Sequence, residues 1–182
     1  MAVPDGMAVV VPRVPDPGFL EIGQGEWEGR LTTEIEARWA EELVGWRRDP
    51  MTIWAPGGES LTSVDGRVRE SLATVLTALR GGSAGTEVPG SQVLGYGGVP
   101  SDEPWTLIVA HDGVFKVTLL ALLDLPLERF WTFPFALAGI SIVEIRAGRP
   151  RLRAHNLTDH LEALETERRQ VLDGERSRSG AL

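Results

Sequence analysis

The stretch Trp105-Thr106-Leu107-Ile108-Val109-Ala110-His111-Asp112-Gly113-Val114 decides the fold. Its first six residues form an almost continuous apolar run, which is typical of a strand buried on both faces of a parallel sheet. His111-Asp112-Gly113 then leads directly into an apolar segment with the length of a helix, Val114 to Leu123. We therefore expect a strand–turn–helix unit here.

The segments on either side of this unit alternate between strand and helix patterns. Alternation of this kind favours an α/β fold, a three-layer sandwich with a mostly parallel sheet and helices on both faces. Only Trp105–Ala110 has the pattern of a central strand, so we expect a neighbouring central strand to be absent. The other expected elements are a strand at Met7–Val11, a helix from Thr32 or Thr33 to Arg48, a helix over Leu61–Leu79 capped by Ser60, a short helix near Leu127–Trp131, strands Ile140–Arg146 and Leu152–Asn156 joined at Gly148, and a charged helix from about Thr158 to Leu172.

The length of 182 residues suits one domain, which we expect to span residues 1–172. A hydrophobic fraction of 42% and a charged fraction of 24% are typical of a globular protein with a proper core. Residues 80–104 are rich in Gly, Pro and Ser, which predicts a long flexible loop, either an active-site flap or a tolerated insertion. Residues 173–182 are expected to be a disordered tail.

Charge and cysteine content exclude several classes of function. The chain has no cysteine, so disulfides, thiolate metal sites and a cysteine nucleophile are excluded. Its net charge is −8, with no run of Lys or Arg, which argues against binding to nucleic acid or to an anionic membrane. No secretory leader and no apolar run of membrane-spanning length occurs in the sequence, so we expect a cytoplasmic protein.

His111 lies where the apolar strand ends and the helix begins. Ligands of α/β proteins bind at this carboxyl edge of the sheet. The amides at the start of the helix, with Lys116 in its first turn, could hold an anion such as phosphate beside the imidazole. The alternative, a histidine satisfied by a backbone carbonyl at a strand end, stays open.

Glu59 lies in the loop Pro56-Gly57-Gly58-Glu59-Ser60, just before a helix. A carboxylate near a second anion would have a raised pKa and could act as a general acid. The alternative is an acidic residue favoured by the positive end of the helix dipole. His155 and His160 are separated by an expected strand–helix boundary, so we expect no metal site there.

Four motifs together resemble those of a known family. They are Leu20-Glu21-Ile22 with Gly25-x-Trp27-Glu28-Gly29, Pro56-Gly57-Gly58-Glu59-Ser60, Ile108-Val109-Ala110-His111-Asp112-Gly113-Val114, and Leu123-x-Leu125-Pro126-Leu127. In order and spacing, from about Val9 to Leu161, the chain resembles the histidine phosphatase superfamily, the phosphoglycerate-mutase-like branch.

The resemblance implies that phosphate passes to a histidine and that no cofactor or metal takes part. Glu59 matches the proton-donating acid, and His111 matches the second histidine, which contacts the phosphoryl group. Gly113 matches the glycine that keeps the turn open, and Lys116 stands where many relatives have Arg. Asp112 replaces a residue that is usually Gly, which adds negative charge beside the phosphate site.

The resemblance also implies a nucleophile in an Arg-His-Gly motif that ends the first, central strand, and this chain contains no such motif. Its histidines are 111, 155 and 160. Two interpretations stay open: an N-terminally truncated phosphatase acting on a small phosphorylated substrate, or a non-catalytic relative that binds a phosphorylated ligand or a partner protein. The Gly-Gly-Glu-Ser form of the acid loop favours a phosphatase over a mutase. An unpaired strand edge makes a homodimer possible.

Overall fold

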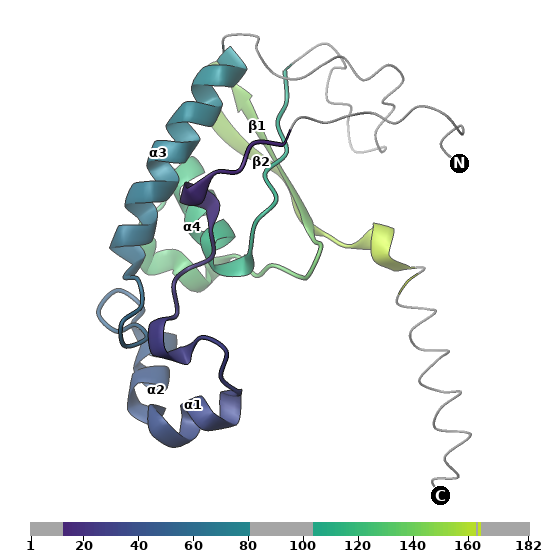
Figure 1. Cartoon of the computed structure of the whole chain (residues 1–182). Coiled ribbons are helices and arrows are strands. Elements are labelled where there is room, and N and C mark those ends of the chain that lie inside the picture. The colour runs from purple at the N-terminus through teal and green to yellow at the C-terminus, as the bar shows by residue number, and fades with distance from the viewer. Residues whose placement is uncertain (1–12, 81–103, 163, 165–182) are drawn as a thin grey trace, which may run out of the picture.

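The computed structural model describes residues 13–80, 104–162 and 164 (Figure 1). The expected strand at Met7–Val11, nearly all of the loop 80–104 and the tail 173–182 lie outside the described residues. Within the described ranges, no helix has both the length and the apolar character needed to cross a membrane.

Helices α3 (Leu61–Arg80) and α4 (Asp112–Leu122) pack against each other (Figure 1). The apolar residues of α3 recur at helical spacing, so one face of the helix is buried. Ser60 accepts a hydrogen bond from the Ser63 N–H at 3.2 Å, which confirms it as the cap of α3. The main core consists of Phe19, Ile22, Leu61, Val64, Val68, Leu72, Val114, Val117 and Phe130.

The expected helix from Thr32 to Arg48 is two helices, α1 (Thr32–Arg38) and α2 (Ala40–Arg48). They meet at Trp39, whose φ of −133° and ψ of 41° are not helical. The Trp39 ring is buried against Trp27 and Ala55, in a second core cluster at the end of the molecule where α3 begins (Figure 1). We infer that burying this ring, a tertiary effect, interrupts a pattern that is locally continuous.

The run Trp105–Ala110 is not assigned as a strand, contrary to expectation. None of its residues makes a backbone hydrogen bond to another described segment. Ile108 and Ala110 pack against the main core, whereas Leu107 and Val109 are 67% and 82% exposed. The described residues therefore form no parallel sheet, because a strand needs a hydrogen-bonded neighbour and this run has none among them.

The one sheet among the described residues is an antiparallel hairpin of β1 (Ile140–Arg146) and β2 (Arg149–Leu157). Ala147 and Gly148 both have positive φ, 49° and 74°, as a two-residue type I′ turn requires. This part of the sequence expectation is confirmed. The short helix expected near Leu127 is the 3-10 helix η3 (Leu127–Thr132). Of the charged helix expected from Thr158, the structure describes only the start, with the 3-10 turn η4 (Asp159–Leu161).

Candidate functional site

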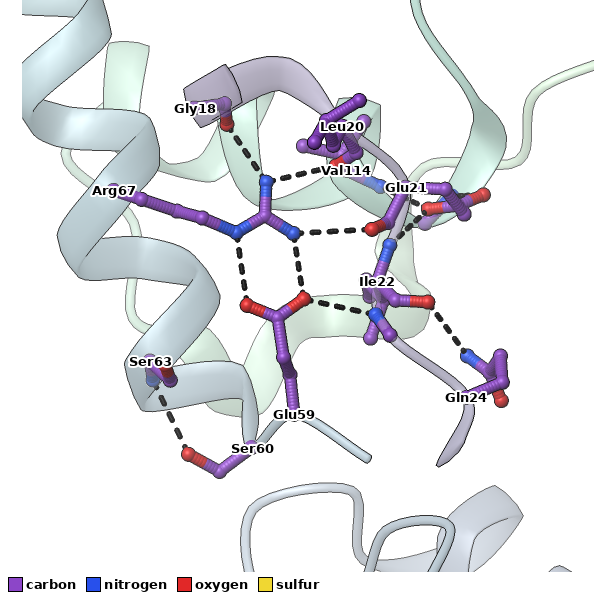
Figure 2. A network of polar contacts seen from close by, with 12 residues as sticks. Gly18, Leu20, Glu21, Ile22, Gln24, Glu59, Ser60, Ser63, Arg67 and Val114 are labelled. Carbon is purple, nitrogen blue, oxygen red and sulfur yellow. Dashed lines mark hydrogen bonds and ion pairs between the residues drawn. The ribbon is translucent and has the colours of Figure 1, made fainter. Parts of the chain in front are cut away.

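Glu59 is held by the helix that follows it and by residues 18–23, which we call the 18–23 segment. Its carboxylate accepts hydrogen bonds from Arg67 Nε at 3.0 Å and Arg67 Nη2 at 2.8 Å (Figure 2). The carboxylate also accepts a hydrogen bond from the Gly23 N–H at 2.8 Å. The backbone N–H of Glu59 in turn donates to the Gly23 carbonyl at 2.8 Å. The side chain is 31% exposed, so it is fixed in place but still reaches solvent.

These contacts favour the ionised form of Glu59. The hydrogen bonds from Arg67 and from the Gly23 amide hold the pKa of the Glu59 carboxyl below its ordinary value, although partial burial opposes them. Because the pKa of Glu59 is lower in the folded state, these contacts stabilise the fold fully at pH values above the ordinary glutamate pKa. That contribution to folding stability is lost as the pH falls through the lowered pKa of the folded state. This differs from the raised pKa expected beside a second anion, since in the described residues the dominant neighbour is a cation.

Arg67 was not singled out by the sequence motifs, yet it makes the largest set of contacts at the site. Besides its two bonds to Glu59, its Nη1 donates to the carbonyls of Gly18 at 2.9 Å and Leu20 at 2.8 Å, and its Nη2 donates to the carbonyl of Glu21 at 3.2 Å (Figure 2). In the sequence, the one indication that Arg67 faces the site is its position between Val64 and Val68, on the edge of the apolar face of α3.

His111 lies at the N-terminal end of α4 and is exposed to solvent. Its carbonyl accepts the Phe115 N–H at 3.0 Å, so its backbone begins the helix. Its imidazole has no hydrogen-bond partner among the described residues. The alternative in which a backbone carbonyl satisfies this ring therefore has no support in this part of the structure.

The free amides expected at the start of α4 are occupied by Glu21. The Glu21 carboxylate accepts from the N–H groups of Gly113 at 3.2 Å and Val114 at 3.0 Å. A Cβ added at Gly113 would lie 2.7 Å from Glu21 Oε1 and 2.9 Å from Ile22 Cδ1. Gly113 therefore permits the close approach of the 18–23 segment, and that segment connects Glu59 to α4, which His111 directly precedes.

We expect Gly113→Ala to destabilise the protein by about 1–3 kcal/mol, because the new methyl group must displace Glu21 or Ile22. Gly66→Ala is the matched control, since a Cβ at this helical position meets no atom within 4 Å. It should be neutral or stabilising by up to about 1 kcal/mol. Denaturant unfolding of the two variants measures both values, and equal stabilities would contradict the role assigned to Gly113.

Lys116 is buried and directed at its own helix rather than at open solvent. Its ammonium pairs with the Asp112 carboxylate. It also lies 5.7 Å from the ring centroid of Phe130 and 5.5 Å from that of Trp131. The structure therefore places the one lysine of the chain where it offsets the charge of Asp112.

The other described histidines lie in the C-terminal part of the chain. Both ring nitrogens of His155 are engaged, with Ser141 Oγ at 3.0 Å and with the Pro134 carbonyl at 2.8 Å. His160 lies in η4, beyond the hairpin. Within the described ranges, no group of three or more His, Asp or Glu side chains is arranged to hold a metal ion.

The fold and the motifs define a known class of protein. Residues 5–85 and 99–158 match the family described as the histidine phosphatase superfamily (branch 1). The chain belongs to this superfamily.

Two of the similar curated proteins are phosphatases. Phosphoserine phosphatase 1 of Hydrogenobacter thermophilus is 26% identical over 146 residues, which cover 79% of this chain and 57% of the relative. Glucosyl-3-phosphoglycerate phosphatase of Mycolicibacterium vanbaalenii is 29% identical over 137 residues, which cover 75% of this chain and 52% of the relative. The chain thus spans little more than half the length of each.

Solved structures show the same fold. A mycobacterial glucosyl-3-phosphoglycerate phosphatase in complex with inorganic phosphate gives a TM-score of 0.61 at 24% identity, covering 79% of this chain and 64% of that one. The alpha-ribazole phosphatase of Shigella flexneri gives a TM-score of 0.57 at 22% identity, covering 78% of this chain and 59% of that one. The similarity to the histidine phosphatase fold is therefore present although the described residues contain only a two-stranded sheet.

Proposed function

We propose that this protein is a phosphomonoester phosphatase of the histidine phosphatase type, which acts on a small phosphorylated substrate through a phosphohistidine. The observation that carries the proposal is that the 18–23 segment contacts both Glu59 and the start of α4, beside His111. The family match supports it. The attacking histidine is proposed to lie in an Arg-His-Gly motif outside this chain, on the strand that would pair with residues 105–110 and complete a parallel sheet.

In this proposal Glu59 is the proton donor to the leaving oxygen. The carboxylate is ionised at rest, as a glutamate is at neutral pH, and the hydrogen bond from Arg67 lowers its pKa further. A phosphate dianion bound nearby would raise the pKa of Glu59 by like-charge repulsion, so the carboxyl would take up a proton when substrate arrives. The acid form is then present at the stage at which the leaving group needs a proton.

His111 is proposed to contact the phosphoryl group and to stabilise its charge, since its ring is exposed and has no partner among the described residues. Gly113 keeps the turn open for the 18–23 segment. Lys116 contributes by neutralising Asp112, so that the departure from the usual glycine adds little net negative charge beside the phosphate. The names of the relatives favour a phosphatase over a mutase.

The second candidate is a non-catalytic protein that binds a phosphorylated ligand or a partner protein. One observation favours it: none of the histidines at 111, 155 and 160 lies in an Arg-His-Gly motif. Binding of phosphate does not separate a phosphatase from a protein that binds a phosphorylated ligand. Turnover separates them once a segment that carries the Arg-His-Gly motif is joined to the chain, since this chain contains no such motif.

Phosphate binding tests the site that a phosphatase and a binder of a phosphorylated ligand would share. In proton NMR spectra, inorganic phosphate should shift the ring resonances of His111 in a saturable way, whereas sodium chloride at matched ionic strength should not. His160, on the 3-10 turn beyond the hairpin, is the internal control and should respond equally little to both salts. The proposal fails if His111 and His160 respond alike to phosphate.

A further inference from the structure

We propose that Arg67 is the positioning residue of this site, which locks the Glu59 carboxylate and the 18–23 segment into one unit. The inference rests on the function proposed for Glu59. Arg67 binds both oxygens of the Glu59 carboxylate and acts through that carboxylate and the segment that it holds, without contacting the phosphoryl group in this scheme.

The geometry of the guanidinium carries the proposal. An arginine side chain has five N–H donors in a rigid planar fork. Arg67 uses them in five hydrogen bonds, two to the Glu59 carboxylate and three to backbone carbonyls of the 18–23 segment (Figure 2). A lysine has one ammonium centre and cannot reach a carboxylate and three carbonyls together.

The surroundings make Arg67 the dominant charge acting on Glu59. The side chains of the pair are 21% and 31% exposed, so water screens their attraction only in part. In the 18–23 segment, the Gly23 N–H donates a hydrogen bond to the Glu59 carboxylate. The carboxylate of Glu21 accepts from the amides of α4 instead. Removing the guanidinium therefore leaves one backbone amide to favour the ionised form.

The other contacts of the 18–23 segment explain why one arginine can position a whole segment. At its start, Asp16 accepts the Gly18 N–H at 2.8 Å and the Ser71 hydroxyl at 2.6 Å, which ties the chain to α3. At its other end, Glu21 ties it to α4. Arg67 fills the gap between these two anchors by binding the carbonyls of residues 18, 20 and 21.

The test is a pH titration of the Glu59 side-chain carboxyl by carbon-13 NMR in the full chain. In Arg67→Met the titration midpoint should rise by about one pH unit or more, because an opposite charge in contact lowers a carboxyl pKa by about 1–3 units. Arg67→Lys keeps the charge without the fork, so its midpoint should lie between those of the parent and of Arg67→Met. Should Arg67→Met fail to fold, Arg67→Lys carries the test alone.

Arg69→Met is the matched control. Arg69 lies on the same helix and pairs with Asp65 at 2.7 Å, so this variant removes a similar ion pair away from Glu59. Its Glu59 midpoint should equal that of the parent. The inference is overturned if the Glu59 midpoint of the folded Arg67 variants equals that of the parent. It is also overturned if Arg69→Met shifts this midpoint as much as the Arg67 variants do.

Failure of this inference is distinguishable from failure of the proposed function. The Arg67 titrations use no phosphate, so they report on positioning alone. Repeating the parent titration with saturating inorganic phosphate should raise the Glu59 midpoint. A rise on Arg67 replacement without a rise on phosphate addition would support the positioning role and contradict the role of Glu59 as an acid beside phosphate.

Discussion

We expect the 182-residue chain to hydrolyse p-nitrophenyl phosphate no faster than a protein-free blank. Covalent phosphoryl transfer needs an attacking imidazole, and an acid with a phosphate-binding histidine cannot replace it. Among this chain's histidines, His155 has both ring nitrogens engaged and His160 lies beyond the hairpin. Losing the nucleophile of a covalent catalyst costs roughly a millionfold in kcat, which brings the rate to background.

His111→Ala is the control for this assay. It should leave the background rate unchanged, because His111 is assigned to charge stabilisation and has no transfer step to assist in this chain. Turnover clearly above the blank that His111→Ala abolishes would contradict the prediction. His111 would then have to be assigned as the nucleophile, and the exposed ring with no partner among the described residues would have to be explained in that role.

The second large effect that we expect is self-association through residues 104–110. This run carries no charge, exposes Leu107 and Val109, and makes no backbone hydrogen bond to another described segment. Unpaired N–H and C=O groups beside apolar side chains favour pairing with the same run in another copy. Replacing both side chains by lysine should weaken association by about a hundredfold or more, since burial of each is worth about 1.5–3 kcal/mol and every 1.4 kcal/mol is about tenfold.

Val44→Lys with Leu137→Lys is the matched control. These side chains are also highly exposed, 62% and 94%, and the double replacement adds the same charge to a chain of net charge −8. Light scattering at matched concentrations should fall for Leu107→Lys with Val109→Lys and should stay at the parent value for the control. A parent chain that is a monodisperse monomer would contradict the prediction and favour the non-catalytic interpretation.

Elements whose signal is local could be predicted from the sequence. The spacing of Leu61, Val64, Val68 and Leu72 predicts α3, because apolar residues at this spacing form one stripe along a helix that packs against the core. The hairpin follows from alternation on both sides of Gly148, whose positive φ suits the turn. Glu59 and His111 could be selected because each lies where a loop or an apolar run meets a helix.

The remaining features depend on contacts between distant residues. The break at Trp39 comes from burial of its ring against Trp27 and Ala55, which no local pattern encodes. A strand exists only with a partner, so the apolar character of residues 105–110 could not by itself produce one. The cap that Glu21 forms on Gly113 joins residues 92 apart in the sequence, and a single sequence gives no sign of such a pairing.

The burial of Lys116 has a consequence for the chemical reactivity of the chain. It is the one lysine in the sequence, and its side chain is 7% exposed beneath Asp112, Phe130 and Trp131. Reagents that acylate lysine amines therefore find their single side-chain target covered while α4 and η3 stay packed together. We expect acylation at Lys116 to need a local opening of this contact, so the rate of acylation would report on that opening.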